Sequence, residues 1–168
     1  MSSVRSKSVT GVAGDAPANG RAEGDSGSGG RGAAPGGRGT RSIIRIGLAV
    51  FAFYSFAVAA LMVFAPHTFF VDIGPFGVEN DHYLRDTATF EVALGVGLAV
   101  AIWRESWRTP VLCVVALQFA LHTLNHLADI GEAHPYWIGP ADFISLALAT
   151  LALAWLARES MRPLEVQR

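Results

Sequence analysis

The sequence has one cysteine, one lysine and few charged residues of either sign. Cys113 stands alone in an apolar stretch, so a disulfide framework and a cysteine zinc site are excluded. Charged residues make up 16% of the chain and the formal net charge is −1, so nothing indicates a nucleic-acid partner. Lys7 is the only lysine among 13 basic residues, a bias typical of GC-rich genomes such as those of actinobacteria. The chain also lacks a nucleotide-binding motif and a nucleophile constellation.

Residues 1–41 form a segment with almost no large hydrophobic residue. Eleven of the 18 glycines lie in residues 1–40, mixed with serine, alanine and scattered charges. Such a segment buries too little apolar area to offset its ordering entropy, and we predict a disordered tail. It does not resemble a secretory signal, because no short hydrophobic region follows the first basic residues.

Four apolar blocks follow, and the spans are predicted at about 43–65, 87–103, 111–128 and 141–157. A helix needs roughly 20 residues to cross the hydrocarbon of a bilayer, and helix is the form that satisfies its own backbone there. We therefore predict an all-α integral membrane four-helix bundle over residues 42–158. A short tail, 159–168, completes the chain.

Prolines and acidic residues mark the predicted ends of these spans. Pro66 follows the first span, and Pro110 is expected in the first turn of the third, where its missing N–H costs nothing. Pro140 precedes the fourth span, whose start Asp142 is expected to cap. Asp86 suits the positive end of the dipole of the second helix.

The basic residues predict the orientation of the bundle. With four crossings, twelve of the 13 lie on one side, and Arg85 is the exception. Cytoplasmic loops of membrane proteins are enriched in arginine and lysine. We therefore expect a multi-pass protein of the cell membrane with both termini in the cytoplasm.

This topology gathers the unusual polar residues near the outer surface. Gln118, His122, Asn125 and Asp129 share about a 60° sector of the third helix at 100° per residue, with His126 about 40° beyond. A polar stripe should face the interior of the bundle, because polar groups in hydrocarbon are costly unless paired. On the second span, Glu91 lies at a similar depth. The candidate site is therefore a polar cluster of Glu91, His122, Asn125, His126 and Asp129.

Three interpretations of this cluster stay open. The first is an interior hydrogen-bond network that fixes helix packing. In the second, His122 and His126 at spacing i, i+4 ligate a metal, or the cluster serves a haem or a quinone. No glutamate of an HExxH type lies between the pair, and for haem two histidines on one helix are awkward. The third is a pathway for protons or a solute.

A resemblance accompanies this pattern. The outer-loop element Asn80, His82, Arg85 and Asp86, followed by a span and then by His122 and His126, resembles a pattern in small uncharacterised actinobacterial four-span membrane proteins. Size and layout are also similar to DoxX-like proteins, a group loosely tied to quinone-linked redox chemistry. The resemblance covers residues 43–157. It implies the four-span fold and supplies no catalytic residues.

Several functions are compatible with these features. We expect a membrane protein of a non-enzymatic accessory or partner-binding kind, with the bilayer around it and a second copy or other membrane proteins as partners. One alternative is a small redox or metal-dependent membrane enzyme that uses the polar cluster. Another is an oligomeric transporter or proton-coupled carrier. The sequence leaves enzyme activity open.

Overall fold

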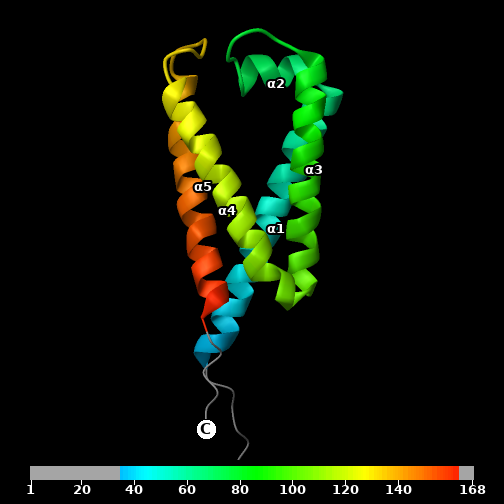
Figure 1. Cartoon of the computed structure of the whole chain (residues 1–168), viewed down its shortest axis with the longest axis vertical. Helices are drawn as coiled ribbons and strands as arrows, with labels where there is room; N and C mark the ends of the chain where they lie inside the picture. The colour runs from blue at the N-terminus through cyan, green and yellow to red at the C-terminus, as the bar shows by residue number, and fades with distance from the viewer. Residues whose placement is uncertain (1–34, 163–168) are drawn as a thin grey trace, which may run out of the picture. The chain divides into compact units, whose positions relative to one another are not determined.

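The computed structural model describes residues 35–162, and the predictions for residues 1–34 and 163–168 lie outside this part. Five helices are present in it (Figure 1): α1 (Pro35–Phe64), α2 (Pro66–Asp72), α3 (Asp81–Trp103), α4 (Glu105–Ala128) and α5 (Ile138–Met161). The predicted all-helical fold is confirmed. Residues 35–41, which were assigned to the tail, instead extend α1, because each residue added to a formed helix gains a backbone hydrogen bond. Residues 159–161 extend α5 in the same way.

Four of these helices are long and apolar enough to cross a membrane: Gly39–Phe64, Asp81–Trp103, Glu105–Ala128 and Ile138–Met161, with 26, 23, 24 and 24 residues. At about 1.5 Å per residue each exceeds the roughly 30 Å of a hydrocarbon core. Many large apolar side chains point away from the protein; Phe53 is 75% exposed, Leu117 60% and Leu151 67%. Such surfaces are rare on proteins in water and suit contact with lipid.

The long helices form two pairs. α1 packs mainly on α3, and α4 packs mainly on α5, whereas contacts between the pairs are fewer. Figure 1 shows the pairs meeting near the start of α1 and separating toward the end that carries α2. Each helix contributes one fully buried leucine to the core where the pairs meet: Leu48, Leu98, Leu112 and Leu153. The hydrophobic core is therefore concentrated away from α2.

The short helix α2 was not predicted. Pro66 ends α1, because the residue before a proline is disfavoured in helical geometry, and Ala65 has φ −143° and ψ 58°. Pro66 then begins α2, since a proline in the first turn needs no N–H donor. The segment is only 7 residues long, too short to give a periodic signal in the sequence.

Helix α3 begins at Asp81, earlier than the predicted position 87. The side chain of Asn80 accepts a hydrogen bond from the backbone N–H of Tyr83 at 3.1 Å and caps the helix. The interpretation of Asp86 as a residue at the helix start is therefore wrong, because Asp86 lies in the second turn. Predicting the span from its apolar residues alone omitted the polar first turns.

Helix α4 begins at Glu105, so the prediction that Pro110 opens this span is wrong and Pro110 lies inside the helix. Arg108 stabilises this junction. Its guanidinium donates to the backbone carbonyls of Ala101 and Ile102, both at 3.2 Å, and to Glu105 at 2.9 Å. The end of α3 and the start of α4 thus share one buried cation.

Helix α5 begins at Ile138, which places Pro140 in its first turn. No side chain caps this helix through a hydrogen bond, so the prediction of Asp142 as the cap is wrong. The physical reason is that proline is tolerated within the first turn and the helix extends back past it. Asp142 is left facing α4, where it takes part in the site described next.

Candidate functional site

A cavity of about 600 Å³ lies between the two helix pairs on the side of the bundle that carries α2. All four long helices contribute to its walls, and α2 with the following loop contributes Phe69, Phe70 and Phe76. A volume of this size is typical of small-molecule sites, which are roughly 300–1,000 Å³. The walls combine apolar and aromatic residues with a limited set of polar groups.

The five residues of the predicted polar cluster all line this cavity: Glu91, His122, Asn125, His126 and Asp129. The helical sector predicted for α4 therefore faces the space between the helix pairs. Within the described residues, no hydrogen bond or ion pair joins Glu91 to either histidine. The cluster is an array around a cavity and not a closed network.

The histidines of α4 lie in contact with each other. The ring centroids of His122 and His126 are 4.7 Å apart in an edge-to-face arrangement. Phe76, from the loop after α2, lies edge-to-face against His126 at 4.9 Å. One imidazole therefore packs between its helical neighbour and the loop that covers the cavity.

His126 also faces α5. Its Nδ1 lies 3.9 Å from Oδ2 of Asp142, and the two side chains are 15% and 25% exposed. This separation is too long for a direct hydrogen bond. The sequence contained one signal for this contact, since both residues lie near the same predicted outer boundary. The contact of His126 with Asp142 was not predicted, because Asp142 was interpreted as a helix cap.

Four atoms of the lining are buried without a hydrogen-bond partner among the described residues: Oε2 of Glu91, Oε1 of Gln118, Nδ1 of His126 and Oδ2 of Asp142. Buried polar atoms are normally paired, so unpaired ones call for an explanation. Here the residues that carry them line an open volume. Rotation of these side chains toward the cavity would let a bound molecule complete their hydrogen bonding.

The predicted outer-loop element separates into two parts. Asn80 caps α3 and lines the cavity. The other members lie on the surface of the protein, where His82 faces Asp86 at 3.5 Å and Arg85 faces Asp81 at 3.8 Å. The side chains of His82 and Asp86 are 84% and 63% exposed. These pairs are consistent with a solvated helix start.

A second contact ties α2 to its loop. Nδ1 of His67 lies 2.8 Å from Oε2 of Glu79, within hydrogen-bond distance. This hydrogen bond, together with the negative charge of Glu79, raises the pKa of His67 above its ordinary value. The helix and loop that cover the cavity are therefore linked through a titratable group at the surface.

A metal site requires several donor side chains arranged around one point. In residues 39–162 no group of three or more histidine, cysteine or acidic side chains is arranged to hold a metal ion. His122 and His126 are adjacent, but the carboxylate nearest to them, Asp142, does not complete such a set. The metal interpretation stays a prediction.

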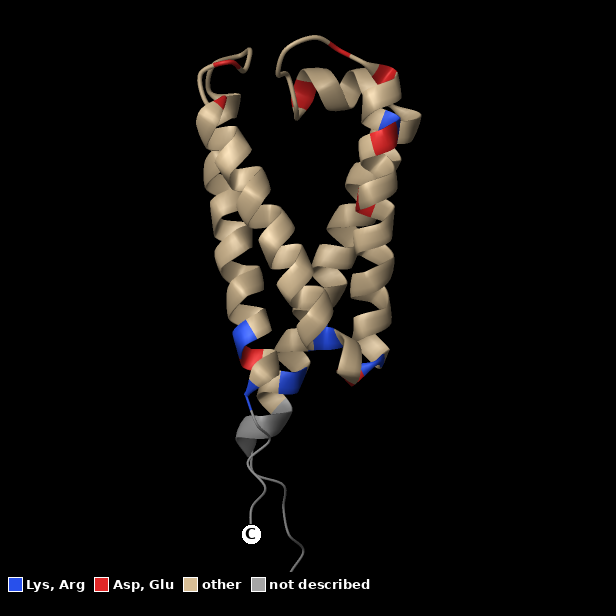
Figure 2. Ribbon diagram, viewed as in Figure 1, with Lys and Arg blue, Asp and Glu red and all other residues tan. Residues whose placement is uncertain are grey.

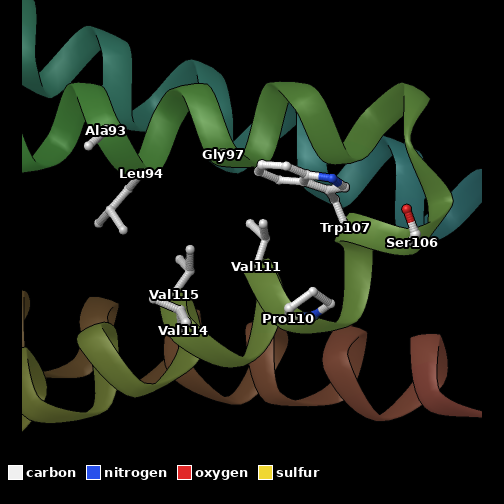
Figure 3. A pocket seen from close by; sticks show the side chains of 9 residues that line it. All are labelled: Ala93, Leu94, Gly97, Ser106, Trp107, Pro110, Val111, Val114 and Val115. Carbon is white, nitrogen blue, oxygen red and sulfur yellow. The ribbon is translucent and has the colours of Figure 1, made fainter.

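A hollow of about 610 Å³ lies between α3 and α4, away from α2 (Figure 3). Gly97, Trp107, Pro110 and Val111 line it with other small or apolar residues, and it contains no titratable group. Figure 3 shows the ring of Trp107 extending across the hollow toward α3. This surface has the composition of a lipid-facing groove and offers no chemistry of its own.

Charge is distributed unevenly along the bundle (Figure 2). Basic residues gather at the end opposite α2, whereas acidic residues predominate at the α2 end. Within the described residues, the two acidic residues at the basic end, Glu105 and Glu159, each form an ion pair with an arginine at 2.9 Å. The positive charge at that end therefore exceeds the negative charge of these two carboxylates.

No family model, curated protein or solved structure matches this chain. The residues of the cavity therefore carry the information on function.

Proposed function

We propose that this chain is a four-span protein of the cell membrane that binds a small amphipathic molecule in the cavity between its helix pairs. In this proposal it is a binding or accessory protein without an enzymatic step. One observation carries the proposal: four residues with unpaired buried polar atoms line a volume of ligand size whose remaining walls are largely apolar and aromatic. A molecule with an apolar body and a hydrogen-bonding head matches both kinds of wall.

The membrane setting rests on the four apolar helices and their exposed side chains. The proposed orientation rests on charge: arginines predominate at the end where α1 begins and α5 ends, which is typical of a cytoplasmic face. The cavity then belongs to the outer half of the bilayer. A molecule dissolved in the outer leaflet has the shortest route to it.

A direct test is to extract small molecules from the protein purified in mild detergent and to identify them by mass spectrometry. The variant Ala149→Phe adds a ring to the cavity wall, whereas Ala154→Phe adds the same ring at an exposed position of α5 outside the lining. We expect a near-stoichiometric molecule in the wild type and in Ala154→Phe, and its loss in Ala149→Phe. Equal recovery from all three proteins would contradict the proposal.

The second candidate function is a small redox or metal-dependent membrane enzyme. The approach of His126 to Asp142 favours it, because a carboxylate beside an imidazole orients the ring for proton transfer or ligation. Elemental analysis and an absorption spectrum of the gently purified protein test this candidate. It predicts a stoichiometric metal or a chromophore that is lost in the His122→Gln/His126→Gln variant; a colourless, metal-free, folded protein would contradict it.

A further inference from the structure

The permanently charged side chains in the described lining of the cavity are all acidic. Three carboxyl groups line it, those of Glu91, Asp129 and Asp142, and among the described residues of the lining there is no lysine or arginine. Arg85, the only arginine of the described residues near this end, lies on the surface, with its side chain 52% exposed and facing Asp81. No permanent positive charge of the described lining offsets these carboxyl groups.

The histidines do not remove this imbalance. His126 is the imidazole near a carboxyl group, and it faces Asp142. Its ring also contacts His122, and two adjacent imidazolium ions repel each other. Glu91 contacts neither ring within the described residues. The Ser55 hydroxyl interacts with its carboxyl group, but Oε2 has no hydrogen-bond partner there, which leaves this atom to interact with a molecule in the cavity.

The unpaired atoms point to the same conclusion. The amide oxygen Oε1 of Gln118 is a hydrogen-bond acceptor. The carboxyl oxygens Oε2 of Glu91 and Oδ2 of Asp142 are acceptors when these groups are ionised. Aromatic residues of the lining form a cluster beside them: Phe119 lies 5.8 Å from Phe51 and 6.1 Å from Tyr54, between ring centroids. Aromatic faces attract cations. Hydrogen-bond acceptors, carboxyl groups and aromatic rings together favour a positively charged donor.

We infer that the cavity selects a molecule whose head is a protonated amine and whose body is apolar, with the Glu91 carboxylate as the partner of the head. This inference rests on the proposed function, because it names the class of molecule bound at the same site. A charge-assisted hydrogen bond is roughly twice as strong as the neutral one that the matched alcohol can form, and the ammonium is also attracted by the carboxylate charge. We therefore expect about tenfold or greater preference for an amine over the matched alcohol.

The test uses three probes with one body: 2-(2-naphthyl)ethylamine, 2-(2-naphthyl)ethanol and 2-naphthylacetate. Binding of each to the full chain in lipid nanodiscs is measured by titration calorimetry, with empty nanodiscs as the blank for partitioning. Glu91→Gln removes the proposed partner, and Glu132→Gln removes an exposed carboxylate outside the lining as the control. Asp142→Asn serves as a second variant if Glu91→Gln fails to fold.

The inference predicts saturable binding with the amine at least about tenfold tighter than the alcohol, and the acetate weakest. Glu91→Gln should bring the amine and alcohol within about twofold, whereas Glu132→Gln should retain the preference. Equal binding of amine and alcohol to the wild type would overturn the inference and leave the proposed binding function standing. Preference for the acetate, or no saturable binding of any probe, would also overturn it, and the extraction test judges the proposed function separately.

Discussion

Nδ1 of His126 lies 3.9 Å from Oδ2 of Asp142, and this approach connects α4 to α5 at the wall of the cavity. The residues are 16 positions apart and lie on either side of the loop that joins the two helices. His126 therefore contributes both to the packing of α4 against α5 and to the lining of the candidate site. Its energetic contribution can be measured separately from ligand binding.

A double-mutant cycle with His126→Gln and Asp142→Asn should show a coupling free energy of about 1 kcal/mol, as expected for partly buried polar neighbours. The free energy of unfolding is measured by titration with a denaturing detergent in mixed micelles. Thr123→Val with Asp142→Asn is the control cycle, since Thr123 bonds to Thr150 at 3.1 Å and not to Asp142. Additive effects in the first cycle would show that the two side chains do not interact.

Replacing Arg108 by Gln should destabilise the protein by roughly 2–4 kcal/mol, because buried carbonyls at the end of α3 lose a charged donor. The guanidinium is 6% exposed, whereas its partner Glu105 is 58% exposed. Arg104→Gln is the matched control, because Arg104 is exposed. Similar unfolding free energies for the two variants would contradict the assigned role of Arg108.

Gly139 and Gly97 should respond oppositely to substitution by alanine. A Cβ at Gly139 would overlap the backbone carbonyl of Ile130, and we expect Gly139→Ala to cost about 1–3 kcal/mol. At Gly97 the nearest atom is a side-chain carbon of Val111 at 3.7 Å, so Gly97→Ala should be neutral or stabilising by up to about 1 kcal/mol. The same unfolding assay measures both, and a reversed order would contradict the packing of the loop before α5.

The contact of His67 with Glu79 predicts a pH dependence. Because folding raises the pKa of His67 above its usual 6.5, the contact stabilises the folded segment fully below that pH. This contribution is lost as pH rises through the raised pKa. NMR titration of the His67 ring should show the raised value in the wild type and in Glu132→Gln, and a lower one in Glu79→Gln. An unchanged pKa in Glu79→Gln would exclude the contact in solution.

Length and hydropathy were sufficient to predict the four long helices, because an apolar run of about 20 residues has few alternatives. The ends of the helices were harder to predict. Asn80 caps α3 seven residues before the start of the apolar run, and Arg108 stabilises a start of α4 that lies before Pro110. Both effects come from polar residues just outside the runs, where hydropathy carries no signal.

The candidate site was predicted in part. Spacing on one helix placed His122, His126 and Asn125 on a common face, and they line one cavity. The pairing of α1 with α3 and of α4 with α5 was not predictable, because lipid and protein interior are equally apolar and hydropathy does not distinguish the packed side of a helix from its lipid-facing side. The contacts of Asp142 and Phe76 with His126 depend on that pairing.

The most direct test of a polar cavity open to the outer side compares two single cysteines at similar depth on α4, in a Cys113→Ser background. His122→Cys lies in the lining, whereas Leu121→Cys replaces a side chain that is 56% exposed on the lipid-facing surface. Intact cells are treated with a membrane-impermeant thiol reagent. We predict that His122→Cys is labelled from outside and that Leu121→Cys is labelled only after the membrane is dissolved. Labelling of His122→Cys only from the inner side, or equal labelling of both cysteines, would contradict the account.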